Sequence, residues 1–416
     1  MRRALLVVAA LLGGVLAPLA PTTPGRAAER CVEAGEAIPG VPWAQQRLEP
    51  RSIWPVSTGA GVRVAVLASG VDARHTQLRG RVSGGEDVLS GGSSSPTTDC
   101  QGIGTSVAGT VAAAFIPNVG FHGLAPKATI VPYRVATGTV VVPPENEGDT
   151  ENGSPQTVAD GIRAATAARS DVLVVPVVTY VDDPELKSAV AAAVAADIVV
   201  IAAVGEGPGT EEGPAVPYPA AYDGVIGVAP FDAEGTVAVD AGALKAVDLV
   251  APGAGLLSTQ AGGGLVEAGG SPIAAGYVAG AAALVRSRWP QAKASDVVQR
   301  LLATAAPMPG EAGYGAVSPA QAVTEIMATG EPSVVPSDLA TVPPDAAARA
   351  ARDRSTAIEA VVAVAVLVVA LLGVGFAVAL PLGRRRRWRP GVAPRPEEHP
   401  EDEVPAPPRT LFEDRR

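Results

Sequence analysis

Few residues in this chain could support nucleophilic catalysis. The sequence holds three histidines, His75, His122 and His399, and two cysteines, Cys31 and Cys100. A serine hydrolase needs a hydroxyl nucleophile, an imidazole to take its proton, a carboxylate to orient the imidazole, and hydrogen-bond donors for the oxyanion. Because no group of histidines and cysteines has the spacing of a transition-metal site, we predict no metal and no cofactor.

Strands and helices alternate along most of the chain. Continuous apolar runs predict strands, and small-residue or amphipathic runs predict helices. This alternation implies an α/β fold, with a parallel sheet covered by helices on both faces. The predicted strands are 62–68, 128–135, 171–180, 199–205, 224–231 and 245–253, and the predicted helices are 102–115, 157–170, 184–198, 274–290 and 296–305.

Two stretches lack such a pattern. Residues 31–59 read as irregular, and residues 137–155 read as a surface loop rich in Pro, Glu, Asn and Gly. The acidic residues within 145–151 are predicted to be solvated, with a weak calcium site as the alternative.

Four short segments stand where a predicted strand ends or a predicted helix begins. The first strand ends in Ala68-Ser69-Gly70, and the next helix opens with Gly102-Ile103-Gly104-Thr105. A later strand runs into Val204-Gly205-Glu206, and the long apolar helix opens with Gly270-Ser271-Pro272. Their order along the chain resembles that of the subtilisin-like (S8) serine proteases, and further segments match at 123–135, 214–230, 247–259 and 313–319.

Within that family the chain is most similar to the mycosins, membrane-anchored proteases associated with type VII secretion in actinobacteria. The segment PWAQQRLEPRSIWPVSTGAGVRVAVL, residues 42–67, resembles the start of the mycosin domain. The resemblance implies a seven-stranded parallel sheet, an N-terminal extension that wraps the body, and attachment to the outer face of the cytoplasmic membrane.

The chain departs from the family at the catalytic positions. The four motifs there carry Asp, His, Asn and Ser, whereas this sequence has Ala68, Ile103, Glu206 and Pro272. Ala68 and Ile103 have no group that could orient or accept a proton, and an ionised Glu206 would repel an oxyanion. Pro272 lacks both a hydroxyl and a backbone N–H, yet proline is well tolerated in the first turn of a helix. We therefore predict no intact catalytic residue.

A relocated catalytic site is the alternative. Ser271 stands beside the nucleophile position, and Ser69 and Asp72 stand near the lost carboxylate. His75 or His122 would have to reach one of these hydroxyls, because a general base acts only within hydrogen-bond distance. Otherwise both histidines are ordinary surface or turn residues.

Cys31 and Cys100 both precede the predicted membrane span, and a disulfide is permitted in an exported protein. If they pair within the chain, the bond ties the N-terminal segment to the body. Two free thiols are the alternative.

Apolar segments near both ends indicate export and anchoring. Residues 1–28 combine Arg2 and Arg3 with a short apolar run, which is typical of a signal peptide. Residues 357–382 are long enough to span a bilayer, and the arginines that follow predict a cytoplasmic C-terminal side. The predicted domains are a signal peptide (1–28), an N-terminal extension (29–60), an S8 domain (61–329), a Pro/Ala-rich linker (330–356), a transmembrane helix (357–382) and a disordered cytoplasmic tail (383–416).

The sequence therefore predicts a membrane-anchored S8 pseudoprotease. The expected partners are a type VII secretion membrane complex or an extended peptide held in the former substrate cleft by strand addition. Nucleic acid is excluded by the net charge of −10 and by the absence of a long basic run before the membrane span. The alternatives are an active serine endopeptidase acting on exported proteins and a scaffold unrelated to secretion.

Overall fold

The computed structural model describes residues 31–89, 94–143, 152–205, 215–239, 242–310 and 312–326. The chain divides into two units, Met1–Ala328 and Thr329–Arg416, and every described residue belongs to the first. Within these ranges no helix is long and apolar enough to cross a membrane. The predicted signal peptide, linker, membrane span and tail lie outside the described residues, as do the acidic segment 145–151 and Glu206.

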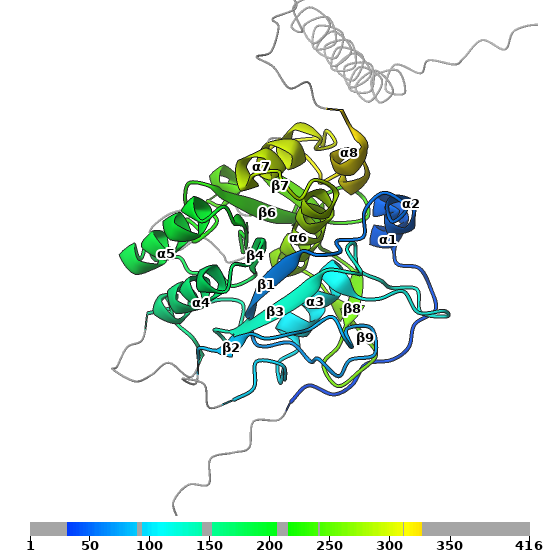
Figure 1. Cartoon of the computed structure of the whole chain (residues 1–416), viewed down its shortest axis with the longest axis horizontal. Helices are drawn as coiled ribbons and strands as arrows, with labels where there is room; N and C mark the ends of the chain where they lie inside the picture. Colours follow the sequence, from blue (N-terminus) through cyan, green and yellow to red (C-terminus); the bar gives the residue numbers. More distant parts are fainter. Residues whose placement is uncertain are drawn as a thin grey trace, which may run out of the picture. The chain divides into compact units, whose positions relative to one another are not determined.

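A seven-stranded sheet forms the centre of this unit, in the order β2-β3-β1-β4-β5-β6-β7 (Figure 1). Every neighbouring pair is parallel, as the sequence predicts. The chain passes from the middle of the sheet to one side and then to the other. The strands are β1 (Arg63–Ala68), β2 (Glu86–Asp87), β3 (Thr129–Arg134), β4 (Val172–Val175), β5 (Val199–Ala203), β6 (Val225–Phe231) and β7 (Leu249–Pro252).

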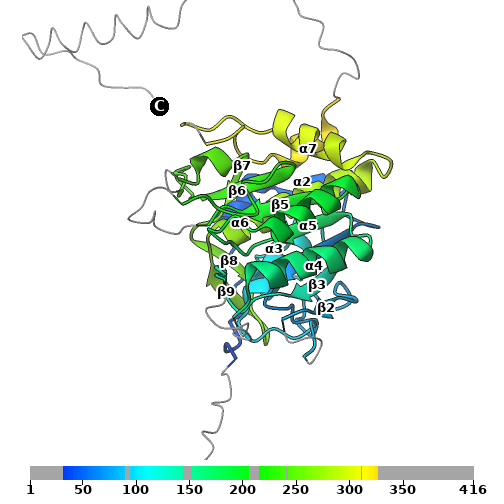
Figure 2. The same cartoon turned by 90° about the vertical axis from the view of Figure 1, so that its left-hand side faces the viewer.

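Helices cover both faces of the sheet (Figures 1 and 2). Alternate residues of each strand point to opposite faces, so Val64 and Val66 pack into one core and Ala65 and Leu67 into the other. The first core holds α3 (Ile103–Ala112), α6 (Ser271–Arg288), α7 (Ala294–Ala303) and α8 (Pro319–Thr324), and the second holds α4 (Pro155–Ala167) and α5 (Pro184–Ala195).

Local sequence explains where these helices start. α4 follows Ser154, whose side chain accepts a hydrogen bond from the backbone N–H of Thr157 in a capping box. α5 follows Asp183, whose carboxylate accepts from the N–H of Leu186. α6 is apolar on every side, which suits a helix buried through the middle of the domain.

The N-terminal extension corrects one prediction. Residues 31–59 contain two short helices, α1 (Trp43–Leu48) and α2 (Pro50–Ile53), where the sequence reads as irregular. Helices this short are not stable by themselves, and tertiary packing holds them. The Trp43 indole N–H donates to the carbonyl of Ala254, and the Ser57 hydroxyl donates to the carbonyl of Leu284 in α6.

The start of the extension lies along a small hairpin, β8 (Leu256–Thr259) and β9 (Leu265–Ala268). Glu36 forms an antiparallel bridge with Leu265, and the two exchange both backbone hydrogen bonds. The disulfide between Cys31 and Cys100 closes this arrangement across a sequence separation of 69 residues, which confirms the intrachain pairing. The extension therefore wraps the body, as the resemblance implies.

Removing this disulfide is expected to destabilise the fold. Replacing Cys31 and Cys100 by serine should lower the free energy of unfolding by about 2–5 kcal/mol, because the unfolded chain regains the entropy of an open loop. Chemical denaturation of the full chain measures the change, and added reductant should have no further effect on the double variant. A loss below about 1 kcal/mol would show that the backbone bridge alone holds the extension.

Candidate functional site

The residues that stand at the family's carboxylate and imidazole positions lie together at the carboxyl edge of the sheet. Ala68 ends β1 with 1% of its surface exposed, and Ile103 is the first residue of α3. A Cβ added to Gly104 would lie 3.1 Å from the Cβ of Ala68, so the strand end and the helix start are in direct contact. Ile103 packs against the core cluster that contains Ala68 and Ala275. An apolar contact occupies this place.

Pro272 stands in the first turn of α6. Gly270 precedes the helix with φ +88°, a conformation that favours glycine, and its N–H donates to the carbonyl of Gly253. The ring of Pro272 is partly exposed, and its missing N–H belongs to the first turn, where no intrahelical acceptor exists. The helix therefore starts as well with proline here as it would with serine.

The serines near these positions form hydrogen bonds that hold the fold together. The Ser271 Oγ is buried and accepts a hydrogen bond of 2.9 Å from the backbone N–H of Gly205. The Ser69 hydroxyl donates to Asp99 Oδ1 at 2.8 Å and accepts from the N–H of Gly104 at 3.1 Å. These bonds join strand ends to helix starts.

Asp99 is a structural residue that sequence reasoning missed. Its carboxylate accepts hydrogen bonds from the N–H groups of Gly102 and Thr105 at 2.8 and 2.9 Å, and from the Thr105 hydroxyl at 2.7 Å. A negative charge at this end is favourable, because the first N–H groups of a helix carry partial positive charge. The signal was available, since an acidic residue just before a predicted helix is a common cap.

Both described histidines lie in a turn or loop, as one alternative predicts, but both are buried, so the prediction of surface residues is wrong. His75 is 3% exposed and His122 is 4% exposed. The N–H of Gln77 donates to His75 Nδ1 at 3.2 Å, so Nε2 carries the proton and donates to the carbonyl of Gly264 at 2.8 Å. Burial lowers the pKa of His75, against the opposing effects of Gly264 and of the Asp72 carboxylate. Burial therefore favours the neutral form of this imidazole, which is part of a turn.

Neither histidine could act on a serine in this arrangement. His122 lies against the rings of Trp54 and Phe115, with ring centroids 5.0 and 6.0 Å away. Burial lowers the pKa of His122 as well, and the nearby Arg51 charge acts in the same direction. Neither ring is hydrogen-bonded to a serine hydroxyl in the described part of the chain.

Asp72 also has a structural role. Its carboxylate accepts from the N–H of Gly262 at 2.9 Å and from the N–H of Arg74 at 3.0 Å. Burial alone would raise the pKa of Asp72, but these bonds and the Arg74 guanidinium outweigh it, and the pKa lies below its ordinary value. The charged carboxylate thus fixes the turn after β1 to the β8–β9 hairpin. Among the described residues no three His, Cys, Asp or Glu side chains could hold a metal ion together.

A small cavity of about 270 Å³ remains beside Pro272. Its walls are mostly backbone and aliphatic groups, including Gly205, Gly270 and Val178. The backbone groups of one wall are already hydrogen-bonded to each other. The N–H of Val178 donates to the carbonyl of Thr139, and the N–H of Val141 donates to the carbonyl of Val178. A peptide could not insert as a strand between these two segments without breaking both bonds.

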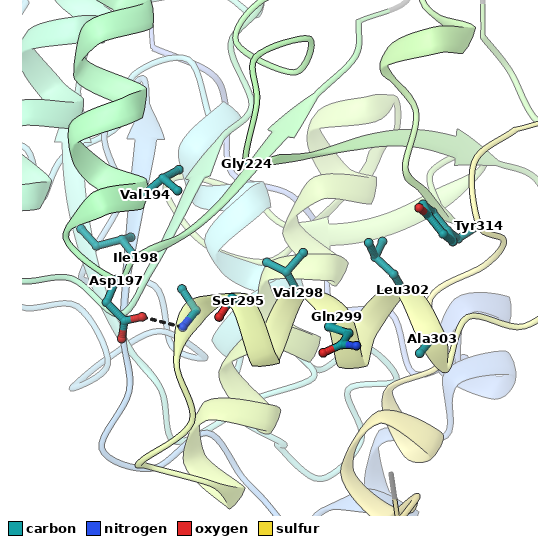
Figure 3. A pocket seen from close by; sticks show the side chains of 11 residues that line it. Val194, Asp197, Ile198, Gly224, Ser295, Val298, Gln299, Leu302, Ala303 and Tyr314 are labelled. Atoms are coloured by element: carbon teal, nitrogen blue, oxygen red, sulfur yellow. Dashed lines mark hydrogen bonds between the residues drawn. The ribbon is translucent and has the colours of Figure 1, made fainter. Parts of the chain in front are cut away.

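A larger groove of about 560 Å³ lies elsewhere, between the end of α5 and α7 (Figure 3). Val194, Val298 and Leu302 form its apolar wall, and Tyr314 stands at the other end. Asp197 accepts a hydrogen bond of 2.7 Å from the N–H of Ala294, the first residue of α7. None of the four motif segments contributes to this groove, so it is separate from the place where the family motifs lie.

The fold and the motif positions agree with one protein family. The profile of the subtilase family, peptidase S8, matches residues 59–334. The chain belongs to this family. It is a mycosin-like member, because Mycosin-4 of Mycobacterium tuberculosis is 32% identical over 324 residues, which cover 69% of this chain and 70% of that protein.

Bacterial subtilases are similar over a shorter part of the chain. The major intracellular serine protease of Bacillus subtilis (strain 168) is 36% identical over 234 residues, covering 55% of this chain and 69% of that protein. Subtilisin DY of Bacillus licheniformis is 34% identical, covering 62% of this chain and 88% of that protein.

Solved mycosin structures share the fold. The MycP3 protease from the type VII (ESX-3) secretion system has a TM-score of 0.59 and 29% identity, and the likeness covers 71% of this chain and 94% of that one. MycP1 from Mycobacterium smegmatis has a TM-score of 0.60 over 73% of this chain and 90% of that one. At 23% identity, the second comparison shows the fold alone.

The apolar contact at Ala68 makes a testable prediction. Ala68→Asp alone should lower the free energy of unfolding by about 3–5 kcal/mol at neutral pH, because a buried charge lacks a partner there. Denaturation curves measure this loss, and Ala68→Asn serves as the uncharged control of similar size. Adding Ile103→His should recover at least about 1 kcal/mol, which the double-mutant cycle isolates.

One outcome would contradict the prediction for Ala68→Asp. If Ala68→Asp and Ala68→Asn lower the free energy of unfolding by the same amount, the position tolerates a charge. The contact between Ala68 and the start of α3 would then not be a desolvated apolar one.

Proposed function

We propose that this chain is a membrane-anchored, mycosin-like S8 pseudoprotease that serves a type VII secretion system as a structural component. The observation that carries the proposal is the apolar contact of Ala68 with the first turn of α3, where Ile103 stands. A subtilase that cuts needs a carboxylate and an imidazole at this contact. The S8 fold around this contact is retained, so replacement of the catalytic residues did not require a change of fold.

The nucleophile side supports the same conclusion. Pro272 offers neither a hydroxyl to attack a carbonyl nor an N–H to stabilise an oxyanion. Ser271 is directed away to the N–H of Gly205, and Ser69 is engaged with Asp99. Replacement of the family's asparagine by Glu206 would add repulsion of an oxyanion, although that residue lies outside the described part of the chain.

The rival function is an active endopeptidase with a rebuilt triad. It requires an imidazole within hydrogen-bond reach of a nucleophile. His75 instead uses both ring nitrogens for the backbone of Gly264 and Gln77, and His122 lies among aromatic rings. The described residues give this rival no specific support.

Association with secretion is inferred from the relatives. The MycP3 and MycP1 structures are of components of type VII secretion systems, and their fold matches this chain. The apolar segment 357–382 and the arginines after it support an anchor with the S8 domain outside the cytoplasm.

A second candidate function is retention of a peptide without cleavage. The cavity beside Pro272 supports it, because it is open and lined in part by glycine backbone at Gly205, Gly269 and Gly270. The paired segments at Thr139 and Val178 limit such a peptide to the remaining free backbone groups.

Deletion and complementation test the main proposal. In the bacterium that carries this gene, deletion should abolish export of type VII substrates into the culture medium. The natural chain should restore export even though it does not cut. A chain that ends before residue 357 should not restore it, because the anchor is missing.

Two outcomes would contradict the proposal. Unchanged export after deletion would remove the link to secretion. Restoration only by a variant with the four catalytic residues rebuilt would mean that cleavage, and not structure, is the required activity.

A further inference from the structure

A short segment of the chain lies along the backbone stretch that follows β4. Residues 139–141, here called the strap, run parallel to this stretch, with Val140 opposite Val178. The N–H of Val178 donates to the carbonyl of Thr139 at 2.8 Å, and the N–H of Val141 donates to the carbonyl of Val178 at 2.9 Å. Both backbone groups of Val178 are therefore occupied by the chain itself.

The strap borders the position at which the family carries its nucleophile. Thr139 and Val140 line the cavity beside Pro272 together with Pro176 and Val178. A peptide whose bond reached position 272 would have to lie along this edge. Such a peptide binds by strand addition, in which its backbone pairs with N–H and C=O groups at the edge.

The stretch after β4 offers a peptide no other way to pair. Backbone groups of alternate residues face opposite sides of an extended segment, so Pro176 and Val178 face the strap. Pro176 has no N–H, and Val178 therefore supplies the only N–H on this side of 176–178. On the other side, Thr179 exchanges both backbone hydrogen bonds with Tyr218, at 2.8 and 2.9 Å. A peptide strand could pair here only by displacing the strap or Tyr218, whose side chain packs against the second core.

The strap is held by few contacts. A Cβ added to Gly138 would meet no atom within 4 Å beyond its chain neighbours and the backbone of Val140. Val140 is 48% exposed and Val142 is 63% exposed, whereas Val141 is buried in the second core. Two backbone hydrogen bonds and one buried side chain thus fasten the strap to the described part of the domain, and the sheet does not depend on it.

We propose that the strap is an autoinhibitory element. It occupies the edge on which an extended peptide would bind, and a peptide pairs with this edge only after the strap has left. The inference deepens the second candidate function and rests on it in one respect, that the cleft receives a peptide strand. It does not rest on the loss of catalysis, because a chain with an intact triad would be closed in the same way.

Two substrates of different reach test the proposal on the full chain in detergent. The catalytic residues are first rebuilt with Ala68→Asp, Ile103→His, Glu206→Asn and Pro272→Ser. p-Nitrophenyl acetate needs no strand pairing, whereas denatured casein must bind in extended form. Adding Val141→Pro, which removes the N–H that fastens the strap, should raise casein cleavage at least about tenfold and leave ester hydrolysis unchanged.

Two further variants separate the strap from its surroundings. Val142→Pro is the matched control, because Val142 is exposed and its N–H forms no hydrogen bond in the described part of the chain. It should change neither rate. Val141→Ala keeps the N–H and removes most of the buried side chain, so it should raise casein cleavage at least about threefold. This second variant decides the question if Val141→Pro does not fold.

Two results would overturn the proposal. Casein cleavage that neither Val141 variant increases would mean that the strap does not block the edge. An equal increase with Val142→Pro would mean that any disturbance of this segment opens the cleft, and that the bonds to Val178 are not what closes it.

Binding to the natural chain gives a test that needs no catalysis. If the rebuilt chain hydrolyses neither substrate, the fault lies in the catalytic positions and the strap is still tested. Val141→Pro in the natural sequence should then bind fluorescein-labelled hexa-alanine at least about tenfold more tightly than the unaltered chain does. N-methylated hexa-alanine should show no such gain, because it lacks the N–H groups that pair with a strand edge. Equal binding of hexa-alanine to both chains, or none to either, would contradict the proposal.

Discussion

The close packing of α6 against α3 fixes the geometry of the whole domain. A Cβ at Gly276 would overlap the Thr110 hydroxyl of α3 and would lie 3.1 Å from the carbonyl oxygen of Val107 in the same helix. Only glycine lets the two helices approach so closely, and both begin at the carboxyl edge of the sheet beside the end of β1. The starts of α3 and α6 therefore stay together whatever side chains stand at positions 103 and 272.

This constraint allows the S8 fold to accommodate Ala68, Ile103 and Pro272 at positions where the family carries catalytic residues. Ala68, Ile103 and Pro272 are each compatible with the element that carries them: a buried strand end, the first residue of a helix and a helix first turn. The polar side chains nearby, Asp99 and Ser271, are held by backbone N–H groups. The residues at these positions thus contribute to folding through helix caps and packing, and the proposed loss of catalysis leaves those contributions in place.

The sequence predicts the strands and helices that are marked by regular runs of apolar residues. Each predicted apolar run from 62–68 to 245–253 contains a strand of the sheet, because both faces of a parallel sheet are buried and the run is continuous. The predicted helix at 274–290 corresponds to α6, which begins at Ser271, in agreement with the helix opening Gly270-Ser271-Pro272 that the motif match predicts. With only two cysteines, the partner in an intrachain disulfide followed from the sequence, whereas the choice between this bond and two free thiols did not.

Other features depend on distant partners and leave little trace in local sequence. The helices α1 and α2 and the strands β8 and β9 have six residues or fewer and are held by tertiary contacts. The burial of His75 requires Gly264, which lies 189 residues away. The hydrogen bond from Gln45 to the carbonyl of His122 forms only when the extension folds over the loop after α3.

A fluorophosphonate serine probe tests the central claim most directly. The full chain is treated beside a variant carrying Ala68→Asp, Ile103→His, Glu206→Asn and Pro272→Ser, and adducts are located by mass spectrometry. Our account predicts no adduct on the natural chain and labelling of the variant at position 272, because the frame that holds the triad is intact. A specific adduct on Ser271 or Ser69 of the natural chain would reveal a relocated nucleophile and contradict the account.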